Sequence, residues 1–317
     1  MNLDWLDAFL IFGAFKVVEI MGLGLLVHLQ LGMTRIANFG VVGFWGVGLY
    51  AFGVAHLKVD WPFGDPYQFL VCAAIATVVA AAAGLVVGWL ISDLDDDGTL
   101  VGTLGFATIV VILATTQQGL TGGALGLGGL GFPYDFGRVK THEFTWLLIT
   151  TAVVVLIFAY AWRVHRTPHG RLLIAIGANE ALARSLGKSA TAARLRMMTV
   201  TSGAMGLLGA MHGVMVRSLE INSLDVGVTL AALAALILGG TARVFGAVVG
   251  VLLTVALFDI VIQFYIPIPD GWNTQALPVA REAVFGAAIV LMLIFRPQGL
   301  LGQMRRPALM RRLHGDW

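Results

Sequence analysis

The chain has little charge and almost no cysteine. Charged residues occupy 12% of its 317 positions, whereas about a quarter is usual in a soluble domain. The single cysteine, Cys72, cannot form a disulfide within the chain, which excludes a small fold held together by disulfide bridges. The formal net charge is only +2 and gives no indication of a nucleic-acid partner.

The patterns of common catalytic and nucleotide-binding sites are missing as well. A Gly-Lys-Ser tripeptide at 187–189 would end a phosphate-binding loop only if position 182 were glycine, and that residue is leucine. No Ser-His-Asp order or pair of carboxylates suggests catalysis. His165 and His169 stand four residues apart without a third metal ligand nearby. We therefore expect no enzyme activity, no cofactor and no metal in this chain.

Long hydrophobic runs are what the sequence does contain. Hydrophobic residues make up 58% of the chain, and the runs approach the roughly 20 residues that a helix needs to cross a bilayer. Glycine and alanine within them suit close helix–helix contact in lipid. The expected fold is all-α, a polytopic integral membrane protein of about nine transmembrane helices (eight to ten). The runs lie at 8–30, 38–56, 69–92, 99–118, 144–162, 197–216, 225–241, 246–265 and 282–295.

Lysine and arginine predict which ends of these helices face the cytoplasm. Seven of them lie within 163–196 against one acid, and five arginines lie within 296–312. Both stretches are expected inside the cell, which places the glycine-rich stretch 119–142 and the acidic N-terminus outside. We expect one transmembrane domain over 1–302 and a basic cytoplasmic tail over 303–317. Between the first two runs, the residues around Arg35 are either a short inner loop or part of a broken helix.

The basic loop at 163–196 has the pattern of two short helices separated near 177–179. Asn179 is suited to cap the second helix, because its side chain can accept a free backbone N–H. Gly187 suits the position after that helix, where a positive φ is needed. Two interpretations follow from the residues alone: a helix that another protein binds, or one that lies on anionic lipid.

Four stretches, in order, carry a resemblance to a known family. They are GRLLIAIGANEALARSLGKSA from 170, TLGF at 103–106 with LTGGALGLGGLGFP at 120–133, ILGGTARVFGAVVG at 237–250, and FRPQGLLG at 295–302. The chain resembles permease subunits of the branched-chain (hydrophobic) amino-acid ABC importer family, of the LivM type. It departs from the family pattern at TRIANF (34–39), at DDDG (95–98) and at GAN (177–179).

The resemblance implies a role and a set of partners. It implies a multi-pass permease of the bacterial inner membrane that moves branched-chain or other hydrophobic amino acids inward by alternating access. Two ATP-binding subunits would hydrolyse ATP with Mg²⁺, beside a second permease subunit and a periplasmic substrate-binding protein. The second loop helix would be the coupling helix that contacts an ATPase, through Asn179, Glu180, Ala181, Ala183, Leu186 and Gly187. Related permeases leave urea, short amides and small organic acids open as cargo.

A further set of residues is considered for the translocation path or a gate. Thr121, Gly122 and Gly123 belong to a stretch too rich in glycine for a stable helix, which either lines the path or meets the binding protein. Asp259 stands alone in an apolar run, and intramembrane charges mark function by default. Lys16 and Glu19 are one helical turn apart, and this spacing favours a mutual pair. An ion-coupled secondary transporter or channel that uses these charges is the rival interpretation.

Overall fold

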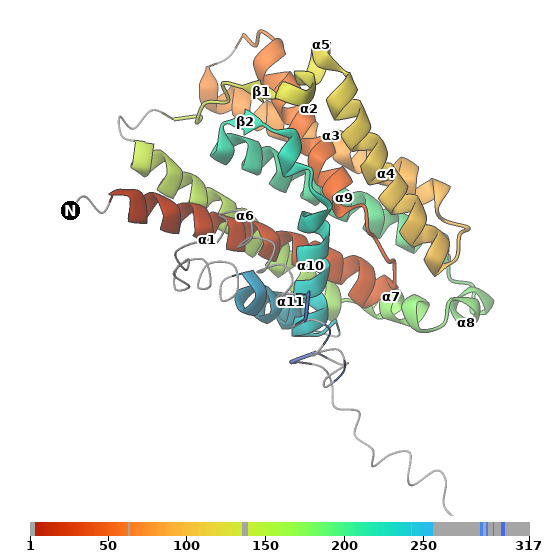
Figure 1. Cartoon of the computed structure of the whole chain (residues 1–317). Coiled ribbons are helices and arrows are strands. Elements are labelled where there is room, and N and C mark those ends of the chain that lie inside the picture. Colours follow the sequence, from red (N-terminus) through yellow and green to blue (C-terminus); the bar gives the residue numbers. More distant parts are fainter. Residues whose placement is uncertain are drawn as a thin grey trace, which may run out of the picture.

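The computed structural model describes residues 4–62, 64–134, 139–241 and 243–255, together with 286, 287, 290, 294 and 299–301. These residues form helices almost throughout, as expected from the sequence (Figure 1). In chain order the elements are α1 (Asp4–Val27), η1 (His28–Met33), α2 (Val41–Lys58), α3 (Asp65–Leu90), α4 (Asp96–Thr116), α5 (Gln118–Thr121), η2 (Gly123–Leu125), β1 (Leu127–Gly128), α6 (Val139–Arg166), α7 (Pro168–Ala178), α8 (Glu180–Ser185), α9 (Ala190–Val216), β2 (Ser218–Leu219), η3 (Ile221–Ser223), α10 (Val226–Gly239) and α11 (Val244–Val251).

Within the described residues, seven helices are long and apolar enough to cross a membrane. They correspond to the first seven predicted runs, so the all-α polytopic prediction is confirmed. The eighth run appears as a shorter apolar helix, Val244–Val255. Most of the ninth run, 282–295, and the tail, 303–317, lie outside the described residues. The count of nine is therefore not confirmed.

Short polar residues begin several of the helices. Asp95 accepts the backbone N–H of Gly98 at 2.9 Å and so caps α4. Asp225 caps α10 in the same manner, and Thr167 caps α7. Such caps satisfy N–H groups that lack a partner in the first helical turn. The acidic stretch 93–98 thus contains the start of α4, and Asp95 caps it.

The helix α9 lies at the centre of the fold, packed closely against α2 and α3. Small residues make this packing possible. A Cβ on Gly48 of α2 would collide with the backbone of Gly206 on α9, and a Cβ on Gly84 of α3 would meet the Ser202 side chain. Lipid offers helices no hydrophobic drive to associate, so such close backbone approach provides the van der Waals contact that holds them together.

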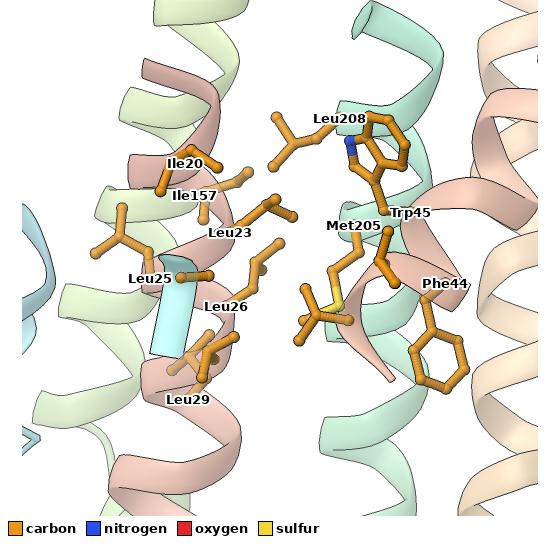
Figure 2. Close-up of a cluster of buried hydrophobic side chains, with 14 of the residues drawn as sticks. Ile20, Leu23, Leu25, Leu26, Leu29, Phe44, Trp45, Ile157, Met205 and Leu208 are labelled. Carbon is orange, nitrogen blue, oxygen red and sulfur yellow. The ribbon is translucent and has the colours of Figure 1, made fainter. Parts of the chain in front are cut away.

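The helix α1 lies beside α6 and joins the rest of the bundle through a buried apolar cluster (Figure 2). Leu23 and Leu26 of α1 and Ile157 of α6 face Met205 and Leu208 of α9 across this cluster. Large apolar side chains on α3, α4 and α6 remain exposed at the surface, among them Val86, Ile109 and Leu156. This is the distribution expected of helices that face lipid.

The two ends of the bundle differ in the loops they carry. The helix α4 begins near Thr191 and Arg194, in the first turns of α9, where their side chains and Asp96 line one cleft. At its other end α4 leads into the glycine-rich stretch, whose β1 strand pairs antiparallel with β2 just after α9. The basic loop and the glycine-rich loop therefore lie at opposite ends, the arrangement that the charge pattern predicts.

Candidate functional site

The basic loop between α6 and α9 forms two short helices, α7 and α8, as the sequence predicts. Asn179 separates them, and its Oδ1 accepts the backbone N–H of Leu182 at 3.0 Å. Gly187 follows α8 with a φ of 73°. The predicted cap and the predicted positive φ are both confirmed. Together they fix the start and the end of a helix of only six residues.

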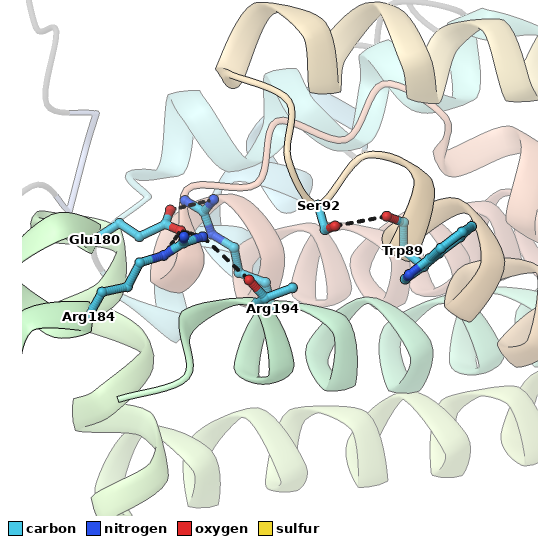
Figure 3. Close-up of polar contacts among 6 residues, drawn as sticks. Trp89, Ser92, Glu180, Arg184 and Arg194 are labelled. Carbon is cyan, nitrogen blue, oxygen red and sulfur yellow. Dashed lines mark hydrogen bonds and ion pairs between the residues drawn. The ribbon is translucent and has the colours of Figure 1, made fainter. Parts of the chain in front are cut away.

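An ion-pair network seats α8 on α9 (Figure 3). The Nε and Nη2 of Arg184 donate to Oε1 of Glu180 at 3.0 and 2.7 Å. The other carboxylate oxygen of Glu180 pairs with Nη1 of Arg194 on α9 at 2.7 Å. Charge-assisted contacts of this kind set an orientation as well as a distance. Glu180 therefore connects α8 to α9 within the chain.

Two exposed leucines accompany the exposed Arg184 and Ser185 on the outward side of α8 and at its end. Leu182 is 58% exposed and Leu186 is 71% exposed, and Asn179, Ala181 and Gly187 are exposed as well. Ala183, expected on the face toward a partner, is instead buried at 6% exposure because it lies on the side of α8 that meets α9. Leu182 takes its place on the outer face. Leu182 is not among the contact residues expected from the sequence, although it stands four positions before Leu186.

The other loop helix, α7, lies against the segment that follows α1. Leu173 and Ile176 of α7 are buried, and a Cβ on Gly177 would meet the backbone carbonyl of Met33 at 2.6 Å. Such a close approach leaves no room for a side chain at this position. The loop therefore packs directly against the end of η1.

The segment around Arg35 interrupts the helical structure between η1 and α2, and this break fits both alternatives that the sequence leaves open, a short inner loop and part of a broken helix. The chain winds into the π-helix η1, loses helical structure from 35 to 40, and resumes as α2. Arg35 has a φ of 55°, a region that non-glycine residues rarely occupy. Backbone groups that are buried outside a helix must find their hydrogen bonds elsewhere in the protein.

Buried side chains supply those hydrogen bonds. Nε2 of Gln30 donates to Oγ1 of Thr201 on α9 at 2.6 Å, and the side-chain Oε1 of Gln30 accepts from Nδ2 of Asn38 at 2.8 Å. Thr103 of α4 and Thr229 of α10 accept the N–H groups of Phe39 and Val42. Side chains from η1, α4, α9 and α10 thus form the hydrogen bonds around the break and the first turn of α2.

A second cluster of polar side chains surrounds Glu19 of α1. Oε1 of Glu19 accepts from Nε1 of Trp45 on α2 at 3.0 Å, and Oε2 lies 2.9 Å from Nδ1 of His212 on α9. The structure thus gives Glu19 two partners that the expected Lys16–Glu19 pair did not include. His28 and His165 form another contact, with 2.9 Å between their Nε2 atoms and their rings stacked.

The residues considered for a gate lie where α5 ends and η2 begins, although the sequence predicts no stable helix in this stretch. Oγ1 of Thr121 donates to the carbonyls of Ala114 and Gln117 at 2.7 and 2.8 Å. Gly122 and Gly123 have φ values of 78° and 61°, and Gly123 is buried. Their role as a gate stays a prediction. Asp259 lies outside the described residues.

Residues 8–293 match the family model described as "Branched-chain amino acid transport system / permease component". The high-affinity branched-chain amino acid transport system permease proteins LivM of Salmonella typhimurium and Escherichia coli are each 29% identical, over 92% of this chain and 68% of their own length. The autoinducer 2 import system permease protein LsrC of an Enterobacter species is 26% identical over 83% of the chain and 73% of its own length. No solved structure matches.

Proposed function

Because the chain belongs to the family of branched-chain amino acid transport permease components, we propose that it is the transmembrane subunit of an ABC importer. In this role it moves branched-chain or other hydrophobic amino acids inward by alternating access. ATP is hydrolysed on two partner subunits, beside a second permease subunit, and a periplasmic binding protein delivers the cargo. The basic loop and the C-terminus lie on the cytoplasmic side.

The observation that carries this proposal is the pair of exposed leucines at α8. Asn179 caps this short helix, Leu182 lies within it, and Leu186 follows its last residue. The Glu180–Arg194 pair holds that helix against α9. This supports α8 as the element that an ATPase subunit binds, and Leu182 and Leu186 as its packing residues.

The loop is also connected to the part of the membrane domain best suited to move. α7 abuts Met33 at the end of η1, and the break at 35–40 follows at once. A ligand or partner shifts an equilibrium only by binding two states differently. Closure of the ATPase pair would act on α7 and α8 together and change the support of the break, whose polar side chains are shared among four helices.

A different cargo is the second candidate. Relatives described as permeases of an autoinducer 2 import system match 83% of the chain. The names of its relatives therefore include more than one substrate. The same membrane domain would then serve a polar solute, and the partner that delivers the solute would select it. Uptake assays with several solutes separate the two.

The test begins with the partners. The tagged chain is extracted gently from native membranes, and copurifying proteins are identified by mass spectrometry. We expect ATPase subunits with the wild-type chain and with Leu125→Asp, a control whose leucine is 97% exposed at the opposite end of the bundle. We expect their loss with Leu186→Asp and Leu182→Asp. A chain that purifies alone and transports in vesicles without ATP would overturn the proposal in favour of an ion-coupled transporter.

A further inference from the structure

A small cleft opens where four membrane spans end, beside α8. It lies between the end of α3, the start of α4, the start of α9 and the break after η1. Its polar lining comes from Arg35, Ser92, Asp96, Thr99, Thr191 and Arg194. The remaining lining is apolar, including Ile91 and Met198. The lining of the cleft therefore combines charges of both signs with apolar side chains.

The two arginines have hydrogen-bond donors to spare. Arg35 is exposed, and within the described part of the chain no acceptor or acid pairs with it. Arg194 uses Nη1 on Glu180, whereas its Nε is buried with no hydrogen-bond partner among the described residues. A buried donor left without a partner calls for an explanation, and an unseen ligand is one. Guanidinium groups suit an oxyanion such as phosphate, and both arginines line this cleft.

The backbone conformation of Arg35 also suggests that its side chain binds a ligand. A φ of 55° costs a side-chain-bearing residue about 1 kcal/mol or more, and glycine would relieve that cost. Strain of this kind is retained where the side chain is used. Among the described residues, the guanidinium of Arg35 has no hydrogen-bond or ion-pair partner that would explain the strain, so it is available to a group outside the chain.

Asp96 adds the opposite charge. The side chain that caps α4 is that of Asp95, so Asp96 is not needed to begin the helix. It lines the cleft with the arginines, and no cation pairs with it within the ranges described. A ligand with an anionic and a cationic group, joined by a short linker, matches this arrangement.

The cleft lies at the level where lipid head groups lie. The span Pro66–Leu90 ends there and the span Asp96–Thr116 begins there. Trp89 and Leu90 beside it are 66% and 62% exposed, and Figure 3 shows Trp89 next to Ser92 at this edge. Tryptophan favours the membrane–water interface, and basic pockets between helix ends bind phospholipid head groups. Acyl chains have an apolar surface to follow along α3.

From these observations we infer that the cleft binds the head group of a phosphoethanolamine lipid. The phosphate lies between Arg35 and Arg194, the ammonium group faces Asp96, and the acyl chains lie along Trp89 and Leu90. The bound lipid fills the space between α3, α4 and the break, so it stabilises the surface on which α8 rests. This inference does not depend on the cargo, and its failure would leave the proposed function intact.

The test measures lipid retained by the purified chain, together with whatever subunits copurify, after repeated detergent exchange. Quantitative mass spectrometry counts phosphatidylethanolamine and phosphatidylglycerol per chain. The variants are Arg35→Gln and Asp96→Asn, with Arg184→Gln and Asp97→Asn as controls, because those two residues carry the same charges nearby but do not line the cleft. Each delipidated sample is then heated with phosphatidylethanolamine micelles, phosphatidylglycerol micelles, inorganic phosphate or leucine.

We expect the wild type and both controls to retain phosphatidylethanolamine preferentially and to gain several degrees in thermal midpoint from it alone. Arg35→Gln should lower retention of both lipids about tenfold, the effect of losing one strong charge-assisted contact. Asp96→Asn should remove only the preference for ethanolamine. Equal retention by Arg35→Gln and the wild type would overturn the inference. A response to inorganic phosphate without lipid would assign the cleft to a free anion, and a response to leucine would assign it to the cargo.

A second variant separates binding from folding. Arg35→Gly removes the guanidinium group and also relieves the positive φ. It should therefore keep or raise the thermal midpoint in lipid-free detergent while losing the retained lipid. If Arg35→Gly retains lipid as the wild type does, the head-group site is wrong whatever the behaviour of Arg35→Gln.

Discussion

Glu19 and His212 are 193 positions apart in sequence, yet Oε2 of the one lies 2.9 Å from Nδ1 of the other inside the membrane domain. Trp45 donates to the second oxygen of the same carboxylate at 3.0 Å. One side chain thus holds α1, α2 and α9 together. A charged group in lipid is costly unless it is paired, and here both carboxylate oxygens have partners.

Removing this carboxylate should destabilise the protein strongly. Glu19→Ala leaves the Trp45 N–H and the His212 imidazole without their acceptor, at a cost of about 3 kcal/mol. Glu19→Gln keeps one acceptor oxygen and should lose about half as much. Thermal unfolding of the purified variants in one detergent checks the order. If Glu19→Ala matched the wild type, the network would have no structural role.

The contact between Gly48 and Gly206 leads to a prediction about packing. A Cβ at position 48 would collide with the backbone of α9, which cannot give way as a flexible side chain can. Gly48→Ala should therefore cost about 3 kcal/mol, at the upper end of overpacking effects. Gly105→Ala on α4 is the control, because a Cβ there meets nothing within 4 Å. Expression level and thermal midpoint of the two variants should differ clearly.

The caps of α8 should matter for binding an ATPase subunit more than for stability. Gly187→Ala forces a side chain into a φ of 73°, at about 1 kcal/mol, although open space surrounds that position. Asn179→Ala removes a cap worth about 1 kcal/mol. Each variant should weaken the affinity for the ATPase subunits about fivefold, measured with purified components. Unchanged affinity in both would mean that α8 is not the element that they bind.

The Glu180–Arg194 pair should act on coupling with little effect on unfolding. Both side chains are partly exposed, so solvent screening limits the pair to about 0.5 kcal/mol. Glu180→Gln should leave the thermal midpoint nearly unchanged and lower ATP-dependent uptake in proteoliposomes several-fold, because α8 loses its fixed seat on α9. Arg184→Gln keeps the bridge to Arg194 and serves as the control. Full uptake by Glu180→Gln would contradict this role.

Local chemistry made part of this structure predictable from sequence. Apolar runs gave the first seven spans, and Asn179 and Gly187 gave the limits of α8, because caps and hydrophobic runs act over a few neighbouring residues. The partners of Glu19 were not predictable, since Trp45 and His212 come from helices that meet it only in the folded chain. Ala183 was misplaced for a related reason. Its orientation depends on where α9 lies, and a six-residue helix carries too few residues to reveal a face.

The strand pair β1–β2 joins the C-terminal end of α9 to the glycine-rich loop. α9 is an uninterrupted helix of 27 residues, about 40 Å long, with Arg194 near one end and Leu219 just past the other. Leu219 pairs with Leu127 of the glycine-rich loop, so α9 connects Arg194, which holds α8, to the loop at the opposite end of the bundle. The neighbouring path from α1 to α2 has no such continuity, because residues 35–40 are not helical. The two ends of the bundle are therefore joined by one continuous helix and one interrupted path.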